Sequence, residues 1–339
     1  MKVIWQHISA GFFLVSTAAV ANVSVKTEID ANHPLLKRFL SKQLEKGYTN
    51  QEVTDFLQPA KKNEEVLRLI QRPWEAKPWY EYYPIFLNQK RIDEGVRFWQ
   101  QYHEPIHAAS QKFKVDPEVI VSILGVETFY GKMTGVYNVR DALYSLSFFY
   151  PPRADLFVRE LGFFMDLTYR EGVDPKQAKG SYAGAMGYSQ FISSSYLSYA
   201  VDFNKNGRRN LQEMEDAIGS IANYLHQHHW RYQEKVIHAA QIGAKKTDIN
   251  ALLWAKEPIK RTLAQWQKYD VEPTKPTKVT SSEKAILFQL DHQQHTEYWF
   301  GLHNFYVITR YNHSHLYAMA VHELGQRIKT KYEATLGKK

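Results

Sequence analysis

The feature that most constrains the fold is a helix start followed by an apolar run. Asp116-Pro117-Glu118 places a capping aspartate, a proline at the first helical position and an acid in the first turn. Residues 119–124 are then apolar on nearly every side, with Ser122 as the exception. Because a helix without a polar face is buried, the sequence predicts a domain built around this helix.

Glu127 lies at the end of the apolar helix, in the segment Gly125-Val126-Glu127-Thr128. A carboxyl group there is expected to be desolvated, and desolvation disfavours its charged form. A protonated carboxyl group in a cleft can act as the general acid of glycosidic cleavage. Taken alone, the residue is explained more simply as a surface glutamate on the last turn of a helix.

The segment from Ser181 to Phe191 combines small residues and glycines with polar side chains. Glycine lets the backbone approach a ligand or another backbone closely. Ser181, Tyr188 and Gln190 offer hydrogen bonds that suit sugar hydroxyls and an acetamido group. A purely structural turn between helices is the alternative.

Residues 202–213 have the spacing of an EF-hand loop. Oxygen-bearing side chains stand at positions 1, 3, 5, 9 and 12, and Gly207 stands at position 6. Arg208 could contribute only its carbonyl oxygen. Because asparagine replaces aspartate twice, we expect weak calcium binding, and a metal-free turn is the alternative.

The composition excludes several kinds of chemistry. The chain has no cysteine, which removes thiol catalysis, cysteine-ligated metals, disulfides and a lipid anchor on cysteine. The net charge is +8, but the basic residues are dispersed, so no nucleic-acid partner is expected. The 22 tyrosines and 8 tryptophans suit a cleft in which sugars stack on rings.

The first residues are typical of an export signal. Lys2 precedes a small or apolar stretch from Ile8 to Ala21, which ends in Ala19-Val20-Ala21. This pattern predicts a signal peptide over residues 1–21, cut after Ala21, with an uncleaved anchor as the alternative. We expect a soluble periplasmic protein without a transmembrane segment or a Cys-linked lipid.

Hydrophobic spacing predicts a mostly helical chain with a small β part over about 231–311. Helices are expected over about 34–70, 91–113, 151–169, 214–225 and 314–330, and strands over 285–290, 298–300 and 305–309. The histidines at 226, 228 and 229 are expected to form a solvated helix end. His322-Glu323 lacks the second histidine of a zinc-protease helix.

At these residues the sequence resembles the bacterial lytic murein transglycosylase B family. The resemblance implies a mainly α (α+β) fold with a lysozyme-like core and an EF-hand-like loop, flanked by a helical domain and a small β domain. The implied domains are 22–85 plus 312–339 (helical), 86–230 (core, with the metal loop 202–216) and 231–311 (β). The matching segments are 125–128, 181–191, 199–207, 216–220, 222–224, 305–306 and 308–314.

The resemblance implies cleavage of the β-1,4 bond between N-acetylmuramic acid and N-acetylglucosamine, leaving 1,6-anhydro-muramoyl ends. By position, Glu127 matches the single catalytic acid and base, and Ser181 and Gln190 match residues near the muramoyl N-acetyl group. Where the family carries an arginine pair, only Arg153 remains. Further implied cleft residues are Tyr82, Tyr188, Phe191, Tyr224, Tyr311, Asn312 and Tyr317.

The resemblance also implies a metal site, with Asp202, Asn204, Asn206, Arg208 and Asp216 as ligands. The EF-hand template instead closes the loop with Glu213, and we favour Asp216. The expected ion is a structural Ca²⁺, weakly bound, or Na⁺, and the chemistry is expected to need no cofactor. The expected partners are peptidoglycan glycan strands, with other cell-wall enzymes as further candidates, and the protein is expected to be a monomer.

Three alternatives remain open at this point. A muramidase would release a reducing end by water attack, and a silent wall-binding scaffold would bind peptidoglycan without turnover. A calcium-dependent structural module would unfold on chelation and would not need Glu127. A transglycosylase needs a single carboxyl group because the second nucleophile belongs to the substrate, whereas ordinary hydrolases use two.

Overall fold

The computed structural model describes residues 28–71, 77–244, 248–275 and 281–337. The chain divides into two compact units, with the boundary between Pro59 and Ala60. The predicted signal peptide, residues 1–21, lies outside the described residues. In the described part of the chain, no helix has the length and apolarity that crossing a membrane requires.

The first unit contains α1 (Pro34–Glu45) and α2 (Asn50–Leu57). Helix α2 begins with a capping box, in which Thr49 and Glu52 each bond the other's backbone N–H. Phe39 and Phe56 are buried and supply part of the small core of the first unit. The expected helical region 34–70 is therefore confirmed, broken into α1, α2 and, in the second unit, α3 (Glu64–Leu69).

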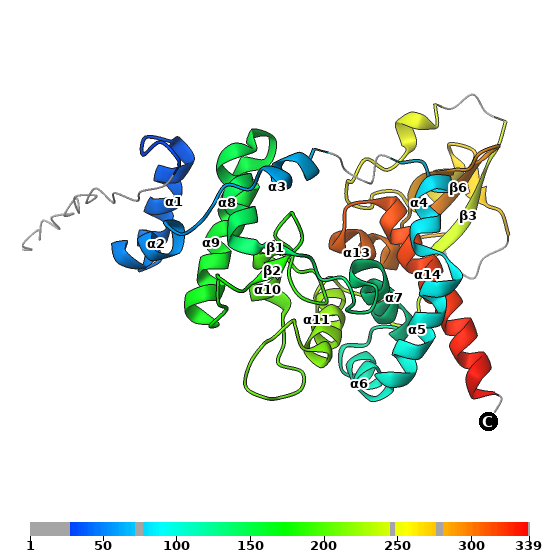
Figure 1. Cartoon of the computed structure of the whole chain (residues 1–339). Helices are drawn as coiled ribbons and strands as arrows, with labels where there is room; N and C mark the ends of the chain where they lie inside the picture. Colours follow the sequence, from blue (N-terminus) through cyan, green and yellow to red (C-terminus); the bar gives the residue numbers. More distant parts are fainter. Residues whose placement is uncertain (1–27, 72–76, 245–247, 276–280, 338–339) are drawn as a thin grey trace, which may run out of the picture. The chain divides into compact units, whose positions relative to one another are not determined.

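The second unit is mostly helical (Figure 1). Its shorter elements are two-residue strands β1 (Tyr137–Asn138) and β2 (Lys179–Gly180), which pair antiparallel, and the 3₁₀ turns Pro151–Arg153 and Asn250–Leu252. Its further helices are α4 (Trp79–Phe86), α5 (Gln89–Gln101), α6 (His103–Phe113), α7 (Pro117–Thr128), α8 (Val139–Phe149), α9 (Ala154–Arg170), α10 (Ser193–Tyr199), α11 (Met214–Gln227), α12 (Leu263–Gln267), α13 (His303–Tyr311) and α14 (His315–Leu336).

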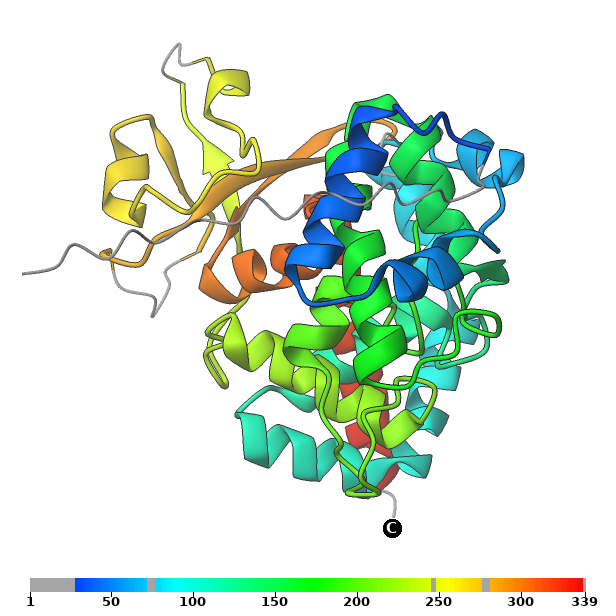
Figure 2. The same ribbon diagram turned by 90° about the vertical axis from the view of Figure 1, so that its left-hand side faces the viewer.

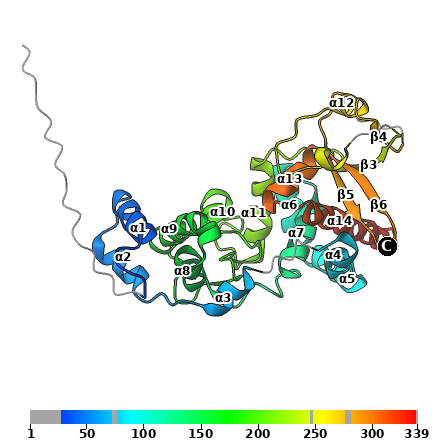
Figure 3. The same cartoon turned by 90° about the horizontal axis from the view of Figure 1, so that it is seen from above.

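Helix α7 is the buried centre of this unit, as the apolar run predicts. Residues 119–125 are all buried, and α7 packs against α5, α6, α11 and α14 (Figures 1 and 3). Gly325 lets α14 approach closely, because a Cβ there would lie 3.0 Å from the carbonyl oxygen of Glu118. The Asp116 side chain does not cap α7, which corrects the expectation: it accepts a hydrogen bond from Trp230 Nε1 at 2.8 Å instead.

The β part forms one antiparallel sheet in the order β4-β3-β6-β5, standing to one side of the helices (Figure 2). Its strands are β3 (Ile237–Ile242), β4 (Val271–Pro273), β5 (Ile286–Asp291) and β6 (Thr296–Gly301). In the long β5–β6 pair, Phe288 lies opposite Trp299. Trp266, Val271, Leu287 and Phe300 are buried together and give the sheet its own core.

Two expectations about elements were wrong in detail. Residues 305–309, expected as a strand, lie within α13, because the run has buried residues at helical spacing, Phe305 with Ile308 and Thr309. The same run also satisfies a strand pattern, so periodicity alone cannot decide. The expected helix over 91–113 is two helices, α5 and α6, which meet at Tyr102.

Candidate active site

Glu127 stands on the last turn of α7 and faces helix α14. It is half-buried, and the hydroxyl of Tyr317 donates a hydrogen bond to its Oε1 at 2.6 Å. Tyr317 is buried, and this burial together with the charge of Glu127 raises its pKa well above the usual value of 10. The phenol therefore stays protonated and acts as a fixed donor to the carboxyl group.

A cluster of aromatic rings continues from Tyr317. The ring of Tyr311 lies nearly parallel to that of Tyr317, with centroids 6.5 Å apart, and meets Tyr224 edge-on at 4.8 Å. Phe191 lies 5.6 Å from Tyr224 and 5.7 Å from Tyr311. Burial raises the pKa values of Tyr224 and Tyr311, so both phenols are neutral donors. The result is an uncharged aromatic wall beside Glu127.

Thr128 ties the end of α7 to the loop over residues 181–191. Its hydroxyl lies 3.2 Å from the carbonyl oxygen of Tyr188 and accepts the N–H of Gly131 at 3.0 Å. The hydroxyl of Tyr311 donates to the carbonyl oxygen of Ser189, which fixes the loop from the other side. The loop is therefore held against both the catalytic candidate and the aromatic wall.

Ser181 and Gln190 keep part of their hydrogen-bonding capacity within this loop. Ser181 Oγ accepts the backbone N–H groups of Ala183 and Ala185 at 3.2 and 3.1 Å, so its own proton remains available to donate. Gln190 has a φ of +50°. Its Nε2 donates to two carbonyl oxygens, those of Thr134 and Gly187, which leaves Oε1 as an acceptor.

The remaining cleft candidates differ in their burial and in their contacts. Tyr82 is buried on α4, close enough to Tyr317 to contribute to the rise in the pKa of Tyr317. The guanidinium of Arg153 lies over the ring of Phe157 at 5.6 Å, and its charge also reaches His313, next to the half-buried Asn312. Tyr188 is half-buried, whereas Phe191 is almost completely buried and forms part of the wall's support.

Sequence reasoning missed two side chains at this site: His228, which stacks on the wall, and Thr128, which holds the loop. His228 stacks on Tyr224 with ring centroids 4.2 Å apart, and burial lowers its pKa from 6.5. The expectation of a solvated histidine cluster is therefore wrong for His228, although His226 and His229 are exposed. The four-residue spacing of Tyr224 and His228 places them on one helix face and could have indicated the pair. Thr128 carried no signal beyond its position next to Glu127.

The sequence offers two carboxylates, Glu213 and Asp216, that could close the EF-hand-like loop, and the structure places them in different surroundings. Glu213 accepts hydrogen bonds from the side-chain amides of Asn204, Asn206 and Asn210, and these lower its pKa. Asp216 is fully buried and accepts backbone N–H groups instead, those of residues 203, 204 and 210 at 2.7–3.2 Å. Glu213 therefore faces the side-chain amide groups of the loop, whereas Asp216 faces its backbone.

This loop is coupled to the candidate site through the backbone. The N–H of Tyr188 donates to the carbonyl oxygen of Leu211 at 2.8 Å. A cavity of about 740 Å³ lies between the two loops, lined among others by Gly187, Arg208 and Leu211. A backbone hydrogen bond therefore joins the EF-hand-like loop to the segment that carries Ser181 and Gln190.

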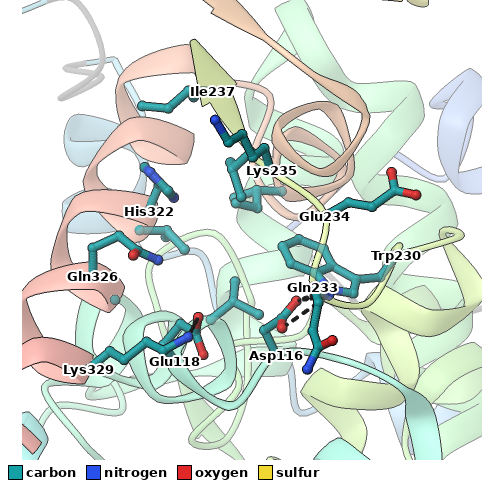
Figure 4. A pocket seen from close by; sticks show the side chains of 15 residues that line it. Asp116, Glu118, Trp230, Gln233, Glu234, Lys235, Ile237, His322, Gln326 and Lys329 are labelled. Carbon is teal, nitrogen blue, oxygen red and sulfur yellow. Dashed lines mark hydrogen bonds and ion pairs between the residues drawn. The ribbon is translucent and has the colours of Figure 1, made fainter. Parts of the chain in front are cut away.

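A second cavity, of about 520 Å³, lies at the other end of α7 and α14 (Figure 4). Lys329 reaches Glu118 Oε1 at 2.8 Å, and Asp116, His322 and Gln326 also line the cavity. Burial lowers the pKa of His322 to about 4. None of the cleft residues expected from the sequence lines it, so this cavity is separate from the site around Glu127.

Most of the chain is similar to known proteins. Residues 31–326 match the family model described as the transglycosylase SLT domain. The chain is 40% identical over 309 residues to membrane-bound lytic murein transglycosylase B of Escherichia coli K12, which covers 88% of this chain and 83% of that protein.

Solved structures resemble this one closely. The E. coli lytic transglycosylase Slt35 in complex with calcium has a TM-score of 0.77 and 40% identity, covering 89% of this chain and 95% of that one. SltB3 from Pseudomonas aeruginosa, in complex with NAG-anhNAM-pentapeptide, has a TM-score of 0.74 and 26% identity, covering 86% of this chain and 78% of that one.

Proposed function

The chain belongs to the transglycosylase SLT domain family and is a peptidoglycan lytic transglycosylase with a lysozyme-like core, and we propose that Glu127 is its single catalytic acid and base. The proposed reaction cleaves the β-1,4 bond between N-acetylmuramic acid and N-acetylglucosamine. The product is a 1,6-anhydro-muramoyl end, formed without water.

In the proposed first step, protonated Glu127 gives its proton to the glycosidic oxygen as that oxygen leaves the muramoyl anomeric carbon. The positive charge that develops on this carbon is met by the oxygen of the substrate's own acetamido group. The remaining proton of Ser181 suits a hydrogen bond that orients this group. The Oε1 acceptor of Gln190 suits the acetamido N–H.

In the second step, the Glu127 carboxylate takes the proton of the muramoyl 6-hydroxyl. The 6-oxygen then attacks the anomeric carbon, and the acetamido oxygen leaves it. Glu127 ends protonated, as it began, so one carboxyl group completes the cycle. Tyr317 is suited to support this double role, because its neutral hydroxyl can donate to Glu127 when the glutamate carries a charge.

The observation that carries the proposal is the surroundings of Glu127. The groups the structure places against it include tyrosines, with the Tyr317 hydroxyl at 2.6 Å and Tyr311 in the same stack. A retaining or inverting hydrolase needs a second carboxylate placed for nucleophilic or base catalysis. Ring faces attract positive charge, so this wall suits the cationic sugar that forms as the bond breaks. The product analysis below separates the proposal from a hydrolytic muramidase.

The test is mass spectrometry of the products released from purified peptidoglycan by the wild type and by Glu127→Gln. Glu323→Gln on α14, half-buried and paired with Arg327, is the matched control. We expect 1,6-anhydro-muropeptides from the wild type and from the control, and none from Glu127→Gln. Reducing-end products would assign a muramidase. Binding without any product from the wild type would assign a scaffold.

The glycan is proposed to lie along the aromatic wall. Tyr224 and Tyr311 would supply ring faces and edges for the sugars, with Phe191 behind them. Tyr82, Tyr188, Asn312 and Arg153 are proposed as further contacts with the glycan. SltB3 from Pseudomonas aeruginosa is solved in complex with NAG-anhNAM-pentapeptide, which supports a peptidoglycan ligand for this chain.

The EF-hand-like loop is proposed to hold a weakly bound Ca²⁺. The donor set fits a hard cation, because Asp202, Asn204, Asn206 and Glu213 all offer oxygen atoms. The carbonyl oxygen of Arg208 would complete it. When bound, the ion would supply loop rigidity rather than chemistry, and Slt35 is solved with calcium.

The protein is proposed to act in the periplasm on glycan strands, as a monomer, with other cell-wall enzymes as candidate partners. The related E. coli protein is named membrane-bound. This chain has no cysteine for a lipid anchor. Cell fractionation with an antibody tests the location: a periplasmic pool supports it, and recovery only with membranes contradicts it.

A further inference from the structure

The turn between β5 and β6 brings two histidines together. The last residue pair of the two strands is Asp291 with Thr296, and the backbone N–H of His292 donates to the carbonyl oxygen of His295 at 2.8 Å. The two imidazole rings therefore stack, with centroids 4.5 Å apart and an angle of 2° between their planes.

Glu297 completes the group, because it stands near the start of β6, two residues after His295. Its two carboxylate oxygens lie 3.4 Å from His292 Nε2 and 3.4 Å from His295 Nε2, respectively. The indole N–H of Trp299, two residues further along the same face, donates to Glu297 Oε2 at 3.1 Å. This bond orients the carboxylate toward the histidines.

We propose that His292, His295 and Glu297 form a binding site for a divalent transition-metal ion of the zinc, nickel or copper type. Bonds of 2.0–2.1 Å around a tetrahedral ion place neighbouring ligand atoms about 3.4 Å apart. The two His–Glu distances have this length, one to each carboxylate oxygen, and one donor atom from each residue lies within 4.8 Å of the others.

The donor atoms select the class of ion. Two imidazole nitrogens and a carboxylate suit zinc, nickel and copper, whereas calcium and magnesium prefer oxygen atoms alone. The side chains of His292, His295 and Glu297 are 25%, 60% and 40% exposed, so the ion can enter from solvent and keep water as a further ligand. The indole N–H of Trp299 holds the carboxylate in place, as hydrogen-bond partners of metal-binding carboxylates commonly do.

Simple ion pairing explains the geometry less well than a metal. Pairing both histidines with Glu297 as ions would stack two cations at 4.5 Å, and these would repel each other. His292 Nε2 is also shielded from solvent without a hydrogen-bond partner of normal length among the described residues. A metal ion satisfies both rings and the carboxylate at once.

The site is chemically distinct from the EF-hand-like loop, so the two are expected to load independently. The loop offers oxygen atoms to Ca²⁺, and the hairpin offers nitrogen atoms to a transition metal. A bound ion would cross-link the turn of the β5–β6 hairpin and stabilise it.

The test is isothermal titration of Zn²⁺ into the full chain, produced without a polyhistidine tag and stripped of metal beforehand. The test variant is the double substitution His292→Ala with His295→Ala. The control is His103→Ala with His107→Ala, which removes a second stacked histidine pair, on α6, with centroids 6.0 Å apart. Visible absorption of bound Co²⁺ reports nitrogen ligation independently.

We expect one equivalent of Zn²⁺ with micromolar or tighter affinity for the wild type and the control. The His292/His295 variant should bind at least 10-fold more weakly, and Glu297→Gln should bind with intermediate affinity. Circular dichroism shows whether each variant is folded. The proposal is overturned if the wild type binds no Zn²⁺, or if the test variant binds as well as the control.

Discussion

The hydroxyl of Tyr317 holds the carboxyl group of Glu127 across 190 residues of sequence. The same two helices are joined again near their other ends, where Lys329 of α14 contacts Glu118 of α7. Glu118 and Glu127 are about 14 Å apart along the axis of α7. The two contacts fix α14 antiparallel to α7, and the position of the candidate acid depends on that register.

Tyr317→Phe is predicted to lower kcat with little change in KM. A hydrogen bond to a charged group contributes about 1.5–3 kcal/mol, so the loss should be about 10- to 100-fold. The measurement is the initial rate of anhydro-muropeptide release. Tyr332→Phe, on the same helix and stacked on Trp99 at 4.5 Å, is the control and should retain activity. Equal rates for both variants would mean that Tyr317 is only a packing residue.

Lys329→Met is predicted to destabilise the protein by about 1–3 kcal/mol, because it leaves the buried carboxylate of Glu118 without its partner. Urea unfolding followed by circular dichroism measures the change. Lys331→Met is the matched control: its pair with Asp93 is exposed and screened by solvent, so its loss should hardly change the stability. Adding Glu118→Gln to Lys329→Met should recover part of the loss, and its failure to do so would contradict the pairing argument.

Much of the fold could be predicted because local signals and tertiary packing agree. The run after Asp116-Pro117 predicts a buried helix, and α7 is buried. Ser314 caps α14 by accepting the N–H of Tyr317, as its place before the last helix suggests. At these positions the local preference and the packed structure require the same conformation.

The remaining features depend on contacts that no local pattern encodes. Residues 305–309 satisfy strand and helix periods alike, and packing within the unit selects α13. The Asp116 carboxylate bonds Trp230, more than a hundred residues away, rather than its own helix. The resemblance led to Glu127 and Tyr317 as separate cleft residues, but their hydrogen bond follows from the packing of α14 on α7.

Glu213→Gln and Asp216→Asn are predicted to separate metal binding from folding. Glu213 faces the asparagine side chains, so its neutral variant should reduce the rise in Tm that Ca²⁺ produces and change the Tm without Ca²⁺ only slightly. Asp216 accepts three backbone N–H groups, so its variant should lower the Tm with and without Ca²⁺. Thermal unfolding in EDTA and in Ca²⁺ measures both, and the reverse pattern would restore Asp216 as the closing ligand.

Gly187→Ala is predicted to displace the loop that carries Ser181 and Gln190. Gly187 has a φ of +70°, and a Cβ there would lie 2.5 Å from both the carbonyl oxygen and the Cβ of Leu211. The backbone strain alone costs about 1–3 kcal/mol, and the clash adds to it. We expect lower stability and a loss of activity of at least 10-fold. Gly172→Ala, also at positive φ but with open space around it, is the control and should lose only stability.

His322 is predicted to make the protein less stable in acid. Burial beside the α7–α14 cavity lowers its pKa to about 4 from 6.5, so the folded protein binds a proton less readily than the unfolded chain. The free energy of unfolding should therefore fall as the pH drops from about 6.5 to 4, by at most about 1.4 kcal/mol per pH unit from this group. Urea unfolding at pH 7 and pH 4.5 should show a smaller loss for His322→Gln than for the wild type. His107→Gln removes an imidazole that is exposed in the folded protein and should keep the wild-type loss, and an equal loss in all three proteins would contradict the assignment.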